Sequence, residues 1–243
     1  MTHPTNREMI EAWSAAIDHV DDFGEEGDVP RQLLLNPAIF ALLGEVRGLR
    51  ILDAGCGQGY LARLLARRGA QVTGVEPADS WYRAVVAQER AAPLGITYLR
   101  EDLATFAAAT QGIDVFDAVV ANMVFMDIPE AEPAIRQCVA ALRPGGSLVF
   151  SLAHPCFEDT EESWARTGAI SVRDYLRESR IPQTFAARFH RPLSYYLNLV
   201  IQAGCALRAI VEPGLGEEWA AHGAWYARNT RVPSFIVMHA TRV

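Results

Sequence analysis

A short apolar segment runs directly into three closely spaced glycines at residues 51–60, ILDAGCGQGY, and this junction constrains the fold more than any other feature. The apolar residues predict a buried strand over 50–55. The segment 60–70 that follows places three leucines on one face of a helix. Glycines between a strand and a helix adopt backbone conformations that other residues avoid, and they let a ligand approach the main chain. The turn therefore either binds a ligand or serves only to reverse the chain.

The alternation of strand and helix continues to residue 154. Further strands are expected over 71–77, 96–102, 116–125 and 147–154, helices over 80–92, 103–109 and 132–142, and a turn at 143–146. Such an order implies right-handed crossovers and a parallel sheet that helices cover on both faces. The predicted fold class is therefore α/β, doubly wound.

The flanking regions lack this rhythm. Helices are expected over 7–20, 31–47 and 193–204, and strands over 206–213 and 234–243. Open α/β sheets bind ligands beyond the carboxyl ends of their strands, where an aromatic-rich insertion after the fifth strand would lie. The expected division is an N-terminal helical lid over 1–46, a core over 47–154, a substrate-covering insertion over 155–192, and a C-terminal helix with two strands over 193–243.

Composition excludes several classes of protein. The net charge is −7, and all 22 basic residues are arginines, so chemistry that needs a lysine amine is excluded. Phosphate binding requires a clustered basic face, so no nucleic-acid partner is expected. No apolar run approaches the roughly 20 residues that span a bilayer, and the N-terminus lacks the features of a signal peptide. We expect a cytoplasmic protein without a membrane partner, and a homodimer is compatible with the sequence.

The four cysteines carry no CxxC spacing, which is typical of reduced thiols. The segment HPCFED at 154–159 brings His154, Cys156, Glu158 and Asp159 close together in the chain. This spacing matches no established metal site, so no metal is expected.

The spacing of Gly55, Gly57 and Gly59 indicates the kind of ligand. A dinucleotide fingerprint, G-x-G-x-x-G, would require glycine at position 60, which is Tyr60. A carboxylate beside the turn, Asp53, would repel a pyrophosphate and would suit a cation. The sequence therefore disfavours a nicotinamide dinucleotide.

Two more acids end predicted strands. Glu76 ends the second strand and can accept hydrogen bonds from both hydroxyls of a ribose, and Asp102 ends the third, where it can meet an adenine edge. The alternatives are a surface acid for Glu76 and a helix N-cap for Asp102.

In order and spacing, five segments resemble the motifs of class I S-adenosylmethionine-dependent methyltransferases: LDAGCGQGY, VTGVEP, REDL, FDAVVANMVFMDI and LRPGGSLVFS. The resemblance covers about residues 49–154. It implies a seven-stranded sheet, mostly parallel with an antiparallel last strand, and S-adenosylmethionine as cofactor with S-adenosylhomocysteine as product. A weaker likeness, in HPCF and HRPLSYYLN, is to bacterial small-molecule methyltransferases.

The resemblance also implies cofactor contacts. Asp53, Gly55, Gly57 and Gly59 would line the methionine part, Glu76 with Pro77 the ribose, Asp102 with Leu103 the adenine, and Asn122 with Met123 the sulfonium. From its residue type, Arg31 could pair with the cofactor carboxylate through its guanidinium, or it could be a solvated residue at a helix start.

Methyl transfer to a hydroxyl or ammonium group requires removal of a proton, for which histidine is the usual candidate. We expect His154 first and His190 second; the alternatives are a cap at the strand exit and a stacking residue of the insertion. Trp13 could close over the cofactor or pack in the core. Aromatic residues such as Trp164, Tyr175, Phe185 and Phe189 could wall an acceptor pocket or form a small core of their own. The expected acceptor contacts are Trp13, Phe125, Tyr195 and Tyr196.

The leading hypothesis is methyl transfer to an oxygen or nitrogen of a small metabolite. Two alternatives stay open: a protein of this fold that binds the cofactor without methylating, and a methyltransferase for a peptide or protein terminus. A dehydrogenase is disfavoured by the glycine spacing and by Asp53.

Overall fold

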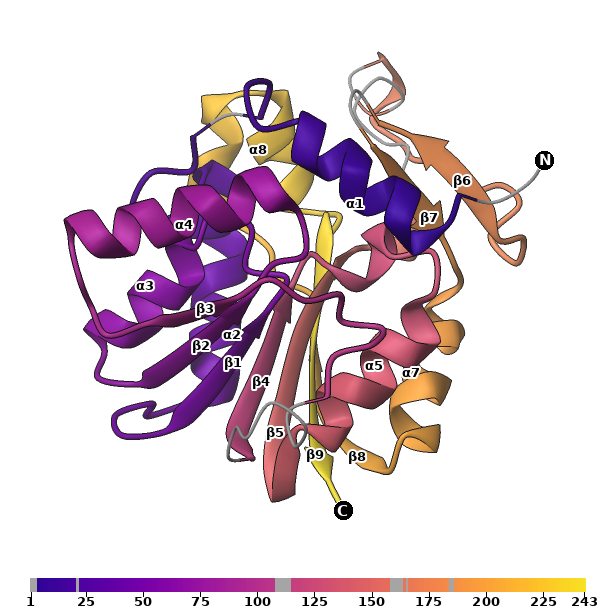
Figure 1. The fold of residues 1–243 in the computed structure, drawn as a ribbon. Helices are drawn as coiled ribbons and strands as arrows, with labels where there is room; N and C mark the ends of the chain where they lie inside the picture. The colour runs from indigo at the N-terminus through magenta and orange to yellow at the C-terminus, as the bar shows by residue number, and fades with distance from the viewer. Residues whose placement is uncertain (1–3, 21, 108–114, 158–163, 165, 184–185) are drawn as a thin grey trace.

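The computed structural model describes residues 4–20, 22–107, 115–157, 164, 166–183 and 186–243. Its centre is a seven-stranded sheet with the order β3-β2-β1-β4-β5-β9-β8 (Figure 1). The strands are β1 (Arg50–Ala54), β2 (Gln71–Val75), β3 (Thr97–Leu99), β4 (Phe116–Asn122), β5 (Leu142–Ala153), β8 (Cys205–Val211) and β9 (Phe235–Arg242). The first five strands pair in parallel, and β9 runs antiparallel to both β5 and β8. The predicted α/β doubly wound class and the antiparallel last strand are confirmed.

Helices cover both faces of the sheet because successive strand residues point to opposite sides. In β1, Leu52 packs in the cluster that includes α5 (Ala131–Ala140) and α7 (Leu193–Gln202). The preceding residue, Ile51, packs in the other cluster. That second cluster includes α2 (Asn36–Leu43), α3 (Tyr60–Arg67) and α4 (Asp79–Ala91). Both layers of core are therefore built on a sheet buried on its two faces.

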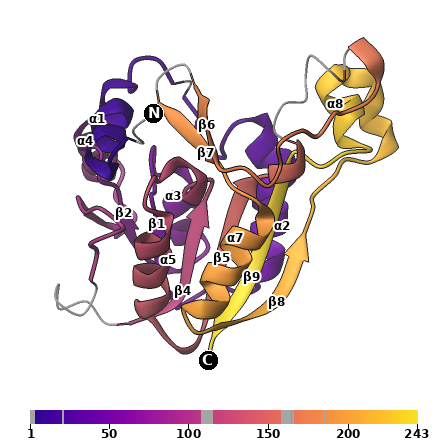
Figure 2. The same ribbon diagram turned by 90° about the vertical axis from the view of Figure 1, so that its right-hand side faces the viewer.

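Helix α1 (Asn6–Ala15) lies against α4 at the end of the sheet where the parallel strands terminate (Figures 1 and 2). The hydroxyl of Ser80 donates to the carbonyl oxygen of Ser14 at 2.6 Å, and Trp81 Nε1 donates to the carbonyl oxygen of Trp13 at 2.9 Å. A capping box formed by Thr5 with Glu8 starts the helix. These contacts fix α1 above the strand ends.

A hairpin of β6 (Ser179–Pro182) and β7 (Ala187–His190) lies beside α1. Met9 of α1 is buried with Phe189 and Ala187 of β7. The sequence did not predict this hairpin, because its strands have only four residues each and β6 is mostly exposed. Helix and hairpin together stand over the carboxyl ends of the strands.

Other differences from the sequence prediction are local. The helix expected over 31–47 is a π-helical turn, η1 (Arg31–Leu35), followed by α2, and the helix expected over 7–20 ends at Ala15. Residues 103–105 form a turn, and positions 108 and 109 of the expected short helix lie outside the described residues.

The expected turn at 143–146 is instead the start of β5. It runs beside β4, where Arg143 Nε donates to Asp117 at 2.7 Å. A helical segment that was not predicted joins β8 to β9: η5 (Glu217–His222) and α8 (Ala224–Asn229). The described residues also contain two short 3-10 turns, η3 (Phe125–Asp127) and η4 (Pro155–Phe157). Among the described residues, no helix has the length and apolar character needed to cross a membrane.

Candidate functional site

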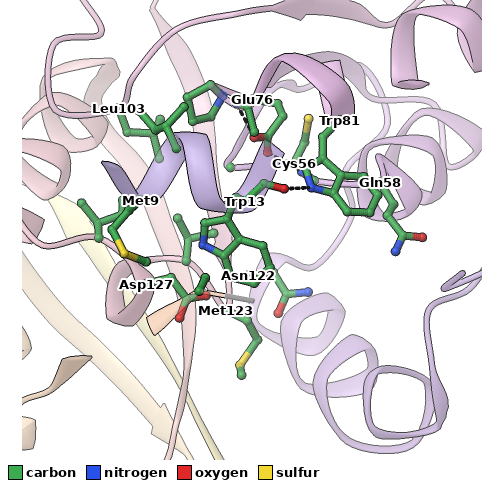
Figure 3. Close-up of a pocket in the computed structure, with 18 of the residues that line it drawn as sticks. Met9, Trp13, Cys56, Gln58, Glu76, Trp81, Leu103, Asn122, Met123 and Asp127 are labelled. Atoms are coloured by element: carbon green, nitrogen blue, oxygen red, sulfur yellow. Dashed lines mark hydrogen bonds between the residues drawn. The ribbon is translucent and has the colours of Figure 1, made fainter. Parts of the chain in front are cut away.

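A cavity of about 450 Å³ lies between α1, the β6–β7 hairpin and the carboxyl ends of β1, β2 and β4 (Figure 3). This is the edge at which open α/β sheets bind ligands. Eleven of the residues singled out in the sequence line it: Trp13, Arg31, Asp53, Gly55, Gly57, Glu76, Pro77, Asp102, Leu103, Asn122 and Met123. The structure therefore brings together residues that are up to 110 positions apart in the chain.

The glycine turn after β1 has two different functions. Gly57 has a φ of +51°, lines the cavity and has no atom within 4 Å of the position that a Cβ would occupy. Gly59 has a φ of +74°, and a Cβ there would lie 2.9 Å from both Tyr98 Oη and Val85 Cγ1. Unlike Gly55 and Gly57, Gly59 is not among the residues that line the cavity. Gly59 lets α3 pack closely on β3 and α4, whereas Gly57 leaves room for a ligand.

Two buried carboxyl groups face the cavity beside this turn. Glu76 accepts hydrogen bonds from the backbone N–H groups of Gly57, at 2.9 Å, and Ala78, at 2.8 Å. Asp53 accepts one from the backbone N–H of Ala62, and its Oδ2 atom is buried without a partner among the described residues. Burial raises the pKa of each carboxyl group to about 7, and Glu76 contributes to the shift of Asp53. Such a pair favours a ligand that brings a cation or hydrogen-bond donors.

Asp102 and Asn6 connect α1 to the far side of the cavity. Asp102 Oδ1 accepts from the backbone N–H of Ala104 at 2.9 Å, so it caps a turn over 103–105 where the sequence alternative expected a helix. Its Oδ2 lies 3.5 Å from Asn6 Nδ2, and Asn6 Oδ1 accepts from the backbone N–H of Glu130 at 3.1 Å. Asn6 therefore joins α1 to the loops after β3 and before α5.

A chain of hydrogen bonds fixes the end of β4. Ser151 Oγ donates to Asn122 Oδ1 at 2.6 Å, and Asn122 Nδ2 donates to Tyr60 Oη at 2.6 Å. Tyr60 in turn donates to Asn36 Oδ1 at 3.2 Å. The next residue, Met123, has a φ of +61°, a conformation uncommon for a residue other than glycine. The oxygen and the nitrogen of the Asn122 side-chain amide are thus both used to hold the strand end at the cavity.

Arg31 reaches the cavity from η1. Its Nη1 lies 2.6 Å from Asp28 Oδ2, and its guanidinium carbon lies 3.9 Å from the centre of the Phe23 ring. The Nε atom of Arg31 is buried and has no hydrogen-bond partner among the described residues. The Arg31 guanidinium is therefore fixed in position to bind an anionic group of a ligand.

Neither histidine expected as a base reaches the cavity. His154 Nε2 lies 2.7 Å from Glu212 Oε1, and its Nδ1 accepts from the backbone N–H of Cys156 at 3.2 Å. His190 Nε2 donates to the carbonyl oxygen of Tyr175 at 2.9 Å, and it borders a separate hollow in the insertion. Both hydrogen-bonding patterns agree with the alternatives that the sequence left open.

Three of the expected acceptor contacts also lie elsewhere. Phe125 and Tyr196 are fully buried in the core on the α5 and α7 face, and Tyr195 packs against the same cluster. Of the aromatic residues in the insertion, Trp164, Tyr175 and Phe189 do not line the cavity, and Phe185 lies outside the described residues. The sequence order placed these side chains near the strand ends, but it could not tell toward which face of the sheet they turn.

Of the lining residues that α1 and η3 supply, the sequence singled out Trp13 and missed the rest. Asn6, Met9, Ile10 and Trp13 all line the cavity from α1. Their spacing at i, i+3, i+4 and i+7 is the signal of one helix face, although it does not tell a core from a ligand. Other missed lining residues are Phe23, Gln58, Trp81, Met126, Asp127, Gln183 and Arg188.

No group of three or more potential metal ligands occurs within the part of the chain that the structure describes. Two acids of the HPCFED segment, Glu158 and Asp159, lie outside it.

Known proteins share this architecture. Residues 52–150 match the family model described as "Methyltransferase domain". A crystal structure of an S-adenosylmethionine-dependent methyltransferase from Mesorhizobium loti superposes with a TM-score of 0.72 at 28% identity, covering 85% of this chain and 96% of that one. Residues 52–150 are therefore similar to a methyltransferase domain, and the chain as a whole is similar in fold to an S-adenosylmethionine-dependent methyltransferase.

The curated relatives are similar over a shorter stretch. A ubiquinone biosynthesis O-methyltransferase from Alkalilimnicola ehrlichii is 34% identical over 109 residues, which are 45% of this chain and 43% of that protein. The chain thus spans less than half the length of this relative. The [4+2]-cyclase SpnF has the same fold, with a TM-score of 0.61 at 18% identity, covering 100% of this chain and 97% of that one. The fold by itself does not define the reaction.

Proposed function

We propose that the protein transfers a methyl group from S-adenosylmethionine to an oxygen or nitrogen of a small molecule. The observation that carries the proposal is the buried, unpartnered oxygen of Asp53 at a cavity that Gly57 leaves open. A buried carboxylate oxygen without a partner is costly, so the site is completed by a ligand that brings a cation or donors. The ammonium group and ribose hydroxyls of S-adenosylmethionine supply them.

The residues around the cavity fit this cofactor from end to end. Asp53 and the backbone of the glycine turn would hold the methionine part, with Arg31 as the partner of its carboxylate. Glu76 would accept from the ribose hydroxyls, and Asp102 with Leu103 would border the adenine. Asn122 and Met123 would lie next to the sulfonium. These roles rest on the lining of one cavity and on the chemistry of each side chain.

When bound, S-adenosylmethionine supplies a methyl group already activated by the positive sulfur. The chain then has to position the acceptor and exclude water. Trp13 and Met9 of α1 stand over the strand ends, and the hairpin packs on α1, so this wall can separate the reacting atoms from solvent. A wall of this kind favours an acceptor small enough to enter the cavity.

The acceptor class is tested by following a labelled methyl group. The full chain is incubated with methyl-labelled S-adenosylmethionine and either the small-molecule fraction or the peptide fraction of a cell extract. We expect label in a small molecule, with the added mass of one methyl group. Label in peptides alone would favour the alternative of a peptide or protein terminus. Bound cofactor without label in either fraction would favour a protein of this fold that does not methylate.

A further inference from the structure

The half of the cavity away from the glycine turn has its own chemistry. Its apolar lining comes from three elements, α1, η3 with the residues after it, and the β6–β7 hairpin: Met9, Ile10, Met126, Ile128, Pro129 and Ala186. Asp127 and Arg188 are charged side chains that line the same cavity, and the charge of Arg31 also acts on Asp127. In the view of Figure 3, Trp13 lies between Asp127 and Glu76.

Asp127 is the last residue of η3, five positions after Asn122 at the end of β4. Burial raises its pKa to about 7, and the charges of Arg188 and Arg31 partly offset that rise. These two guanidinium groups come from two different elements, β7 and η1. A carboxyl group with such a pKa is able to take up and release a proton near neutral pH.

The loop that carries Asp127 is held firmly. The buried guanidinium of Arg191 donates to the carbonyl oxygens of Phe125, Ile128 and Pro129, at 3.4, 3.1 and 2.7 Å. The Arg191 guanidinium thus holds the backbone on both sides of Asp127 by hydrogen bonds. A side chain on a loop fixed in this way is preorganised, as a binding or catalytic group must be.

We propose that Asp127 and Arg188 form the acceptor subsite and that it takes an uncharged hydroxyl compound with an apolar body. This inference rests on the proposed function. The acceptor hydroxyl gives its proton to a carboxylate oxygen of Asp127, and the oxygen is stabilised by the Arg188 guanidinium as its negative charge grows. The oxygen lone pair forms the bond to the methyl carbon, while the electrons of the broken carbon–sulfur bond stay on sulfur. Asp127 then releases its proton to solvent.

The charges favour a hydroxyl over a charged acceptor. A cationic acceptor would be attracted by Asp127 and repelled by Arg188. An anionic acceptor would be attracted by Arg188 and repelled by Asp127. A neutral hydroxyl can donate to the carboxylate and accept from the guanidinium at the same time. The thioether side chains of Met9 and Met126 adapt to flat apolar groups.

Calorimetry on the full chain tests the subsite with simple probes. S-adenosylhomocysteine is titrated first, and the complex is then titrated with phenol, benzylamine and benzoate, which share one ring and differ in charge. We expect millimolar binding of phenol and weaker binding of the two charged probes. Asp127→Asn and Arg188→Gln should each weaken phenol binding by roughly tenfold, the usual loss for a hydrogen bond to a charged group. Both should bind S-adenosylhomocysteine as the wild type does.

Glu132→Gln is the matched control, because it removes an exposed carboxylate of α5 that pairs with Arg136 outside the cavity. It should bind phenol as the wild type does. A second readout is stability: the unfolding temperature of Asp127→Asn relative to wild type should rise as the pH passes from about 4, the pKa of an unfolded aspartate, to about 7. The sign follows because the unfolded aspartate loses its proton over that range while the buried one keeps it, so the wild type loses stability and the amide variant does not.

The outcomes separate the two proposals. Failure of the wild type to bind S-adenosylhomocysteine would overturn the proposed function. Binding of S-adenosylhomocysteine with tighter binding of benzylamine or benzoate than of phenol would overturn the subsite alone. So would the absence of phenol binding, or phenol binding unchanged in both Asp127→Asn and Arg188→Gln.

Discussion

At the scale of the residue, the site depends on carboxyl groups kept away from water. Asp53 is only 2% exposed, and one of its two oxygens has no partner among the described residues. Folding therefore removes this oxygen from water without replacing its hydrogen bonds, which lowers the stability of the free protein. A ligand that donates to the oxygen recovers that free energy as binding affinity. Glu76 differs, because two backbone N–H groups already bond its oxygens.

Asp53→Asn tests this trade. The pKa of Asp53 is about 7 in the folded protein and about 4 in an unfolded chain, so the wild type loses stability as the pH rises between these values. The amide cannot ionise. We expect the variant to unfold at a higher temperature than wild type at pH 8, with a smaller difference at pH 5, and to bind S-adenosylmethionine at least about tenfold more weakly. Thermal unfolding at both pH values and calorimetry measure the two effects. Unchanged affinity would contradict the role given to Asp53.

A pair of glycine substitutions separates binding from packing. Gly57→Ala places a methyl group in open space at the cavity, so it should reduce cofactor affinity with a stability loss of about 1 kcal/mol from the positive φ. Gly59→Ala must also displace Tyr98 or Val85, so its stability loss should be larger, about 2 to 4 kcal/mol. Urea unfolding and calorimetry on both variants check this order. The reverse order would mean that the turn is assigned wrongly.

His154→Ala tests two roles for this histidine: a catalytic base, as expected from the sequence, and a structural contact with Glu212. The substitution removes the contact with Glu212 and a buried ring, so we expect a stability loss of about 1 to 3 kcal/mol and unchanged cofactor affinity. Methyl transfer by the folded fraction should remain. A variant of full stability that transfers no methyl group would restore His154 as a base.

At the scale of the element, α1 is held to the site by side-chain contacts with several separate segments. They join Ser14 to Ser80 and Trp13 to Trp81 of α4, Asn6 to Asp102 and to Glu130, and Met9 to the β6–β7 hairpin. Elements that cover ligands belong to the less stable parts of a protein. The affinity for the cofactor therefore depends on how well α1 is docked.

A double substitution, Ser14→Ala with Ser80→Ala, loosens this docking. Loss of the side-chain hydrogen bonds between α1 and α4 should weaken cofactor binding by roughly threefold to tenfold, while the sheet keeps most of its stability. Arg7→Ala is the matched control, because Arg7 pairs with Glu11 on the exposed side of the same helix. Calorimetry compares the two variants. Equal effects would show that α1 contributes only its local structure.

The elements that the sequence predicted well are those buried on both faces. Strands such as β1 and β4 are short apolar runs, and Gly69, with a φ of +88°, follows the end of α3 as expected. The hairpin β6–β7 and the short helix α8 were missed, because their residues are largely polar or aromatic and lack a clear period. The cavity residues after β1, β2, β3 and β4 could be placed because parallel strands end at one edge.

The positions of His154, Phe125 and Tyr196 could not be predicted, because nearness in sequence to a strand end does not fix where a side chain turns. His154 turns to Glu212, beyond the end of β8, and the two aromatic residues enter the core. Asp127 was overlooked for a related reason. Its significance depends on Arg188 and Arg31, which come from segments 61 and 96 residues away.

At the scale of the whole molecule, one sheet edge gathers every group assigned to the reaction. The central part of the chain supplies the carboxylates and the glycine turn, and α1 with the hairpin supplies a wall that the family match over residues 52–150 does not include. We infer that the core fixes the cofactor and that the added segments select the acceptor.

The most direct test of this account is a calorimetric titration of the full chain with S-adenosylmethionine, S-adenosylhomocysteine and NAD, side by side. We expect micromolar binding of the first two and no binding of NAD, because the unpartnered oxygen of Asp53 at the cavity would repel a pyrophosphate. Binding of NAD, or no binding of either sulfur nucleoside, would contradict it.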